Sequence, residues 1–212
     1  MKKVLLVIAF LILSCKNDEI NHPNILFIMS DDHTSQSWGI YGGILKDYVK
    51  NDGIKRLAKS GVVLENLFCT NAICVPSRAS ILTGQYSHVN GVYNLPDALD
   101  PDSLNVAKVL KNNGYQTSIV GKWHLKKEPS GFDYYKVLPG QGLYNDPYFK
   151  TKGNWENGGR GGEKEKGFSA DIIGDSSIEW LKKIDNKKPF FLMTHFKATH
   201  EPFDYPVRNK DL

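Results

Sequence analysis

Residues 74–84 read Cys-Val-Pro-Ser-Arg-Ala-Ser-Ile-Leu-Thr-Gly, an order that places a thiol where an anion could bind. Pro76 favours a first helical turn, and Gly84 favours the end of the same helix. Cys74 is therefore expected at a helix N-terminus, where free N–H groups and the positive end of the helix dipole meet. Arg78 follows one turn later on the same face. The pattern indicates a reactive cysteine in a pocket suited to an anion.

Two adjacent acids follow the apolar run over residues 24–30. Such a run is typical of a strand that is buried on both faces of a parallel sheet. Asp31 and Asp32 then lie at the carboxyl edge of the strand and repel each other unless a cation compensates them. Because their oxygens are hard ligands, the pair favours Ca²⁺ or Mg²⁺. Two solvated loop aspartates are the alternative.

A lysine and a histidine follow the strand expected over residues 115–120. If the strand continues through them, Lys122 and His124 point the same way. A fixed cation and a titratable imidazole on one face could hold a tetrahedral oxyanion. The alternative is a surface lysine beside a histidine whose hydrogen bonds are all made within the fold.

Patterns of apolar residues elsewhere in the chain predict the helices and strands that must position these residues. The helix over residues 54–61 should turn Leu57 inward, and the helix over residues 103–114 should begin at a Ser103 cap with Leu104 buried. The spacing of strand, helix, strand and reactive turn predicts an α/β sandwich with a mostly parallel central sheet, a class in which ligands gather beyond the carboxyl ends of the strands. We also expect a helix over residues 169–184 and strands over residues 62–68 and 189–196.

Residues 126–167 are rich in glycine, aromatic and polar residues and are expected to form long recognition loops. Aromatic side chains there could stack on a sugar, and a basic side chain could pair with an acidic group. A plain surface insertion is the alternative. The candidates are Tyr144, Tyr148 and Trp155 for stacking and Lys152 or Arg160 for pairing.

Residues 1–15 form a targeting segment, with two lysines followed by an apolar run. The run ending in Ile-Leu-Ser-Cys resembles a bacterial lipobox, which implies that Cys15 is acylated and that residues 16–23 are a tether. An ordinary cleaved secretory signal is the alternative. Either one predicts export, to the periplasm or the outer-membrane surface, with membrane contact only through a lipid on Cys15.

The composition is that of an ordinary globular chain of 212 residues, 41% hydrophobic and 24% charged. The formal net charge is +4, and no concentrated basic stripe accompanies it. A nucleic acid partner is therefore not expected.

Three motifs together resemble the type I sulfatases. They are Cys-x-Pro-Ser-Arg with the following Thr-Gly, Gly-Lys-Trp-His at residues 121–124, and the looser His-x-Pro at His200. The resemblance implies an alkaline-phosphatase-like fold and conversion of Cys74 to Cα-formylglycine. That conversion requires a partner, either a formylglycine-generating enzyme or an anaerobic sulfatase-maturating enzyme. A plain Cys74 thiol, or a disulfide with Cys69, is the alternative.

The resemblance also implies roles for individual residues. A gem-diol derived from Cys74 attacks sulfur, His200 protonates the departing alcohol, and His124 acts as the base that releases sulfate. Lys122 and Arg78 offset negative charge. The implied metal is Ca²⁺, with Mg²⁺ as the alternative, held by Asp31, Asp32 and the modified Cys74.

The chain departs from the family pattern after His200. An Asp-Asn or Asp-His pair that completes the calcium shell, and a further lysine on the sulfate ester, have no counterpart there. Residues 24–212 are therefore interpreted as the N-terminal part of a sulfatase catalytic domain, incomplete at its C-terminus. Such a polypeptide alone is expected to bind calcium weakly and to turn over little substrate.

Three functions remain in competition. The Asp-His-Thr-Ser-Gln run from Asp32 resembles carbohydrate-directed sulfatases, such as N-acetylglucosamine-6-sulfatases that degrade glycosaminoglycans, so a sulfated carbohydrate is the expected substrate. The second is a phosphonate or phosphate ester hydrolase of the same superfamily. The third is a non-catalytic surface lipoprotein that binds sulfated glycans.

Overall fold

The centre of the fold is a four-stranded parallel sheet with the order β1-β6-β2-β3. The computed structural model describes residues 22–49, 51–156 and 160–210. The strands are β1 (Ile25–Met29), β2 (Gln116–Lys122), β3 (Tyr134–Leu138) and β6 (Phe190–His195). This confirms the predicted α/β class with a parallel sheet. The predicted signal segment, Cys15 and most of the tether lie outside the described residues.

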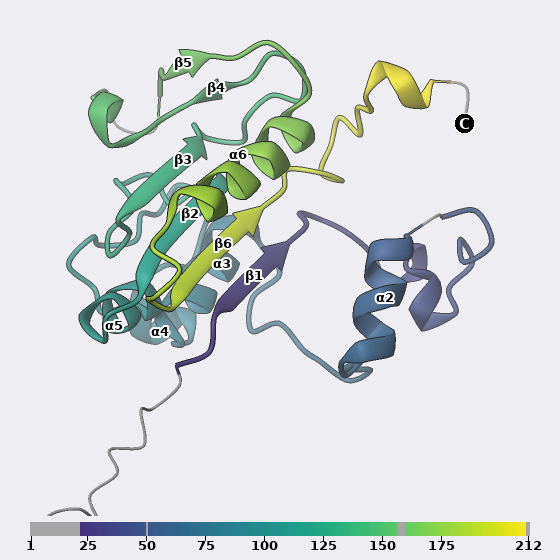
Figure 1. Cartoon of the computed structure of the whole chain (residues 1–212), viewed down its shortest axis with the longest axis horizontal. Coiled ribbons are helices and arrows are strands. Elements are labelled where there is room, and N and C mark those ends of the chain that lie inside the picture. Colours follow the sequence, from purple (N-terminus) through teal and green to yellow (C-terminus); the bar gives the residue numbers. More distant parts are fainter. Residues whose placement is uncertain (1–21, 50, 157–159, 211–212) are drawn as a thin grey trace, which may run out of the picture.

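Helices cover both faces of the sheet (Figure 1). One face carries α6 (Ser169–Lys183), and the other carries α3 (Cys74–Thr83), α4 (Ser87–Asn90) and α5 (Val106–Asn112). In the described part of the chain, no helix is long and apolar enough to cross a membrane. Short 3-10 turns occur at Ser35–Ser37, Gly39–Tyr41, Lys152–Asn154 and Val207–Asn209.

Two apolar cores hold the layers together. On the α3 and α5 side, Ala79 and Ala107 pack with strand residues such as Ile119. On the α6 side, Ile173 packs with Val120 and Leu192. Because alternate residues of β2 and β6 feed opposite cores, these two central strands are buried on both faces.

The helix starting at residue 103 was predicted too long at its N-terminus. α5 begins at Val106, and its cap is Asn105, whose side chain accepts a hydrogen bond from the Lys108 N–H at 3.0 Å. Leu104 therefore precedes the helix and is 68% exposed, not buried.

The expectation that the first strand is buried on both faces was wrong. β1 pairs only with β6 in the described structure, and α6 lies over β6 and β2 rather than over β1 (Figure 1). Its exposure therefore alternates, with Leu26 and Ile28 exposed by 50% and 54%. An apolar run at a sheet edge has the same composition as a central one, so the sequence pattern did not separate them.

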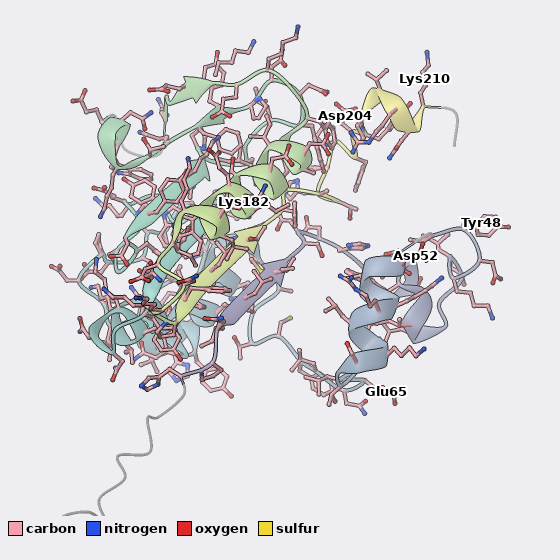
Figure 2. The ribbon with its side chains drawn as sticks, viewed as in Figure 1. Tyr48, Asp52, Glu65, Lys182, Asp204 and Lys210 are labelled. Atoms are coloured by element: carbon pink, nitrogen blue, oxygen red, sulfur yellow. The ribbon has the colours of Figure 1, made fainter. Side chains whose placement is uncertain are left out.

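The predicted strand over residues 62–68 is also wrong, because these residues form no strand. They follow α2 (Asp52–Ser60), and Val62 and Phe68 are 84% and 85% exposed. Leu57 of α2 is exposed as well, contrary to expectation. Figure 2 shows the part of the chain that carries Asp52 and Glu65 standing away from the sheet, and α2 contacts the 3-10 turn at Gly39–Tyr41 instead.

The glycine-rich region contains more regular structure than predicted. β3 lies within it, and β4 (Tyr148–Phe149) pairs with β5 (Glu163–Lys164) in a small antiparallel hairpin. The loops between them remain, but Tyr144 is only 4% exposed and is not available as a stacking face. Its hydroxyl donates a hydrogen bond to the carbonyl of His200.

Gly121, one residue before the end of β2, permits a close approach between the backbones of β2 and β6. Its φ of +105° lies in the region that favours glycine, and a Cβ there would lie 1.9 Å from the carbonyl oxygen of His195. This close approach brings the carboxyl ends of β2 and β6 together.

We expect Gly121→Ala to unfold the protein or to destabilise it by roughly 3 kcal/mol or more, because the new methyl group meets backbone on the neighbouring strand. Gly114→Ala is the control, since Gly114 has a φ of +85° but an added Cβ meets nothing within 4 Å. It should cost about 1–2 kcal/mol from backbone strain alone. Urea unfolding measures both, and equal losses would contradict this account.

Candidate active site

A buried carboxylate lies between two buried cations at the carboxyl edge of the sheet. Asp31 Oδ1 accepts a hydrogen bond from Arg78 at 3.2 Å, and its Oδ2 accepts one from Lys122 Nζ. Asp31, Arg78 and Lys122 are all 5% exposed or less. Three elements therefore meet at one acid: the loop after β1, the helix α3 and the end of β2.

The charges in this cluster determine how Asp31 ionises. Burial alone would raise the pKa of Asp31, but Arg78 and Lys122 outweigh burial and hold the pKa below its ordinary value. The carboxylate is thus ionised at neutral pH. The Arg78 guanidinium also donates to the carbonyl oxygen of Lys122 at 2.6 Å, which fixes the helix against β2.

Cys74 is the first residue of α3 and lies beside the same acid. Its Sγ is 3.9 Å from Asp31 Oδ1 and 4.0 Å from Lys122 Nζ. Burial raises the pKa of the Cys74 thiol, and Asp31 and Asp32 raise it further, against the opposing effect of Lys122. Cys74 and Cys69 are both free thiols, so the disulfide alternative is wrong.

The second acid and the predicted leaving-group histidine face each other. His200 Nε2 lies 3.6 Å from Asp32 Oδ2. His200 Nδ1 lies 2.8 Å from the carbonyl oxygen of Glu201, which only accepts, so Nδ1 carries a hydrogen. Backbone bonds join the two loops, from the Asp31 N–H to the Ala198 carbonyl at 2.9 Å and back from Thr199 to Asp31 at 2.8 Å.

These residues meet part of the requirement for a calcium ion. One ligand atom each from Asp31, Cys74 and His200 lies within 4.8 Å of the others. Carboxylate oxygens suit Ca²⁺, and Asp32 adjoins the group, but Ca²⁺ takes roughly six to eight oxygen ligands. Within the described ranges, this cluster supplies fewer ligand oxygens than Ca²⁺ requires. Lys122 and Arg78 already compensate Asp31, so an ion bound there competes with both cations.

His124 is placed differently from the prediction. β2 ends at Lys122, and His124 has a φ of +59°, so the two side chains do not continue one strand face. Burial and the nearby Lys122 lower the pKa of His124 to about 4, and its Nδ1 is buried without a hydrogen-bond partner in the described structure. His124 lines a cavity beside the cluster and makes no described hydrogen bond to Cys74.

Sequence reasoning missed three polar residues of this edge. His195, at the end of β6, is buried, and its Nδ1 lies 3.2 Å from Arg78 Nη1. Gln141 accepts a hydrogen bond from Lys122 Nζ at 2.5 Å. Lys197 is buried, with its Nζ 4.8 Å from the centre of the Tyr144 ring. The rule that selected Asp31, a polar residue directly after a predicted strand, would have indicated Lys197, which follows the strand predicted over residues 189–196.

The molecule is thus an α/β protein in which a thiol, a buried acid and two cations meet at the carboxyl edge of a parallel sheet. The chain matches the Sulfatase family model over residues 23–211, and it belongs to that family. The resemblance inferred from the motifs is confirmed.

Known relatives include enzymes named for sulfated carbohydrates. The chain is 43% identical over 198 residues to an N-acetylglucosamine-6-O-sulfatase of Bacteroides thetaiotaomicron, covering 91% of this chain and 34% of that protein. It is 30% identical over 230 residues to an ulvan-active sulfatase of Formosa agariphila, covering 100% of this chain and 44% of that protein. The chain therefore spans less than half the length of these relatives.

A solved structure has the same fold. It is a protein in complex with its substrate D-glucosamine-2-N,6-O-disulfate, and it matches with a TM-score of 0.81 and 41% identity over 88% of this chain and 36% of that one. The alkaline-phosphatase-like sulfatase fold predicted from the sequence is confirmed for the part that this chain spans.

We expect Asp31→Asn to lower the free energy of unfolding by roughly 3–5 kcal/mol when measured in EDTA, because Arg78 and Lys122 then remain buried without their carboxylate. Asp32→Asn is the matched control. Its side chain is 52% exposed, and we expect a loss below about 1 kcal/mol. Equal losses in urea unfolding would show that the Asp31 cluster does not stabilise the fold.

Proposed function

We propose that the full-length gene product hydrolyses a sulfate ester with a formylglycine made from Cys74 and with a bound Ca²⁺. The observation that carries the proposal is the position of Cys74 at the start of α3, beside Asp31 and Lys122. A cysteine that reacts as a thiolate normally has a lowered pKa. The pKa of Cys74 is raised, so its unmodified thiol is a poor nucleophile and serves better as a precursor.

Individual residues of this chain have separate roles in the proposed reaction. When bound, calcium supplies positive charge for the sulfate oxygens, and the hydrated aldehyde supplies the attacking oxygen. Lys122 and Arg78 keep positive charge at the same edge throughout. His200 is suited to protonate the leaving oxygen from Nε2, because Nδ1 is held by the Glu201 carbonyl and Nε2 is the ring nitrogen that faces Asp32. His124, neutral at pH 7, is the proposed base.

The proposed substrate is a sulfated glucosamine of a glycosaminoglycan. Support comes from the names of the relatives, one an N-acetylglucosamine-6-O-sulfatase and one solved with a glucosamine disulfate. The proposal includes export as a lipoprotein anchored through Cys15, and a maturation enzyme as partner. These follow from the sequence of residues 1–15 and from the Cys-x-Pro-Ser-Arg motif.

A phosphonate or phosphate ester hydrolase remains the second candidate. The chain matches the structure of a phosphonate monoester hydrolase of Agrobacterium radiobacter with a TM-score of 0.63 at 21% identity, a likeness of fold alone. Parallel assays of aryl sulfates and aryl phosphates separate the two. A glycan-binding protein without catalysis would hydrolyse neither.

We expect the Cys74 peptide of the protein from its native host to be about 18 Da lighter than the cysteine form, the change that accompanies conversion of the thiol to an aldehyde. Fragment-ion mass spectrometry of the peptide over residues 60–78 locates the change, and Cys69 in the same peptide is the internal control. An unmodified Cys74 in a host that makes formylglycine elsewhere would sink the proposed mechanism.

We expect chelation to reduce aryl sulfate hydrolysis by the full-length product at least about tenfold, with recovery on adding Ca²⁺, because the acid pair then lacks the cation that supports the sulfate oxygens. Chelator saturated with Ca²⁺ beforehand is the control. Activity that is unchanged after exhaustive chelation would remove calcium from the proposal.

A further inference from the structure

A cavity of about 440 Å³ adjoins the catalytic cluster. Its walls come from the loops after β2 and β3 and from the loop after β4, and we name it the aromatic cavity. The residues that matter for its chemistry are Trp123, His124, Lys126, Gly140, Trp155 and Arg160.

Two of its lining residues are close in the chain to residues of the site. His124 lies two residues after Lys122, and burial with the charge of Lys122 lowers its pKa. Gly140 precedes Gln141, whose side-chain oxygen accepts a hydrogen bond from Lys122 Nζ at 2.5 Å. The aromatic cavity therefore begins near Lys122, at the same edge of the sheet as Cys74.

Two indole rings give the cavity its apolar surface. The Trp123 N–H is satisfied by the Lys127 carbonyl at 2.7 Å, so the ring itself needs no polar partner from a ligand. Trp155 packs edge-on against Tyr135, with ring centroids 5.9 Å apart. Trp123 is only 5% exposed, so the half-buried Trp155 is the ring available to the apolar face of a sugar.

The charged residues of the cavity are all basic. Lys126 and Arg160 line it, and its described lining contains no carboxylate. His124 adds a buried Nδ1 without a hydrogen-bond partner in the described structure. An anion in the cavity thus gains attraction from both cations and meets no opposing charge within the lining.

A buried lysine holds the backbone at Trp155, Glu156 and Arg160. Lys150 is 0% exposed, and its Nζ donates to the carbonyls of Trp155 at 3.1 Å, Glu156 at 2.6 Å and Arg160 at 2.7 Å. The same ammonium lies 4.8 Å from the centre of the Trp155 ring. The backbone that presents the two residues is therefore tied to β4 before any ligand arrives.

We propose that the aromatic cavity binds an anionic group of the sugar substrate that is not hydrolysed, such as a second sulfate. This rests on the proposed function, since it assigns a second recognition site to the same substrate. It also separates two residues that the sequence left equivalent: Arg160 lines the cavity, whereas Lys152 does not.

The test is calorimetric binding of two sugars to the full-length gene product. D-glucosamine-2-N-sulfate carries an anion but no 6-O-sulfate, and N-acetylglucosamine is neutral. We expect the sulfated sugar to bind at least about tenfold more tightly. Arg160→Gln and Lys126→Gln should each weaken its binding roughly three- to tenfold and leave the neutral sugar unchanged.

The matched controls are Lys152→Gln, from the same loop as Arg160, and Lys127→Gln, the neighbour of Lys126. Both should bind the two sugars as the unaltered protein does. Equal affinity for the two sugars, no binding of either, or the same loss in a control and its partner would overturn the proposal.

Aryl sulfate hydrolysis, measured in parallel, keeps this inference separate from the proposed function. An aryl sulfate has no second anionic group, so its turnover reports only on the catalytic cluster. Preference for the sulfated sugar without turnover would support the cavity and contradict the catalytic proposal. Turnover without preference would do the reverse.

Discussion

The structure depends on compensation of one buried charge, the carboxylate of Asp31. Removing an ionised acid from water is costly unless cations and hydrogen bonds replace the lost hydration. Here Arg78 and Lys122 replace it, and each comes from a different element. The same pairing that makes the buried acid tolerable therefore joins the loop after β1, the start of α3 and the end of β2, and Cys74 lies at their junction.

The surroundings of Cys74 also bear on the proposed nucleophile. A thiol placed against Asp31 is pushed toward its protonated form, although the neighbouring cations act in the opposite direction. An oxygen nucleophile made after translation avoids this difficulty, because it does not depend on the thiolate. The site is thus better suited to a modified Cys74 than to the cysteine itself.

The sequence predicted those parts in which local pattern and packing agree. Cys74 at the start of α3 and Asp31 at the end of β1 followed from helix signals and from an apolar run, and the structure places both. It failed where the outcome depends on the neighbouring element. Whether β1 is central or at an edge is a property of the sheet order, and Val62 forms a strand only if it finds a partner. The side chain of His124 was predicted on the wrong face because β2 ends at Lys122, and the sequence did not indicate where that strand ends.

The uncovered side of β1 has a consequence for handling the protein. Its outer edge presents backbone donors and acceptors without a neighbouring strand in the described structure, next to the bare side chains of Leu26 and Ile28. Such an edge is a template for joining one molecule to another, and natural proteins usually shield it. A preparation in which this surface stays open should accordingly lose material to precipitation as its concentration rises.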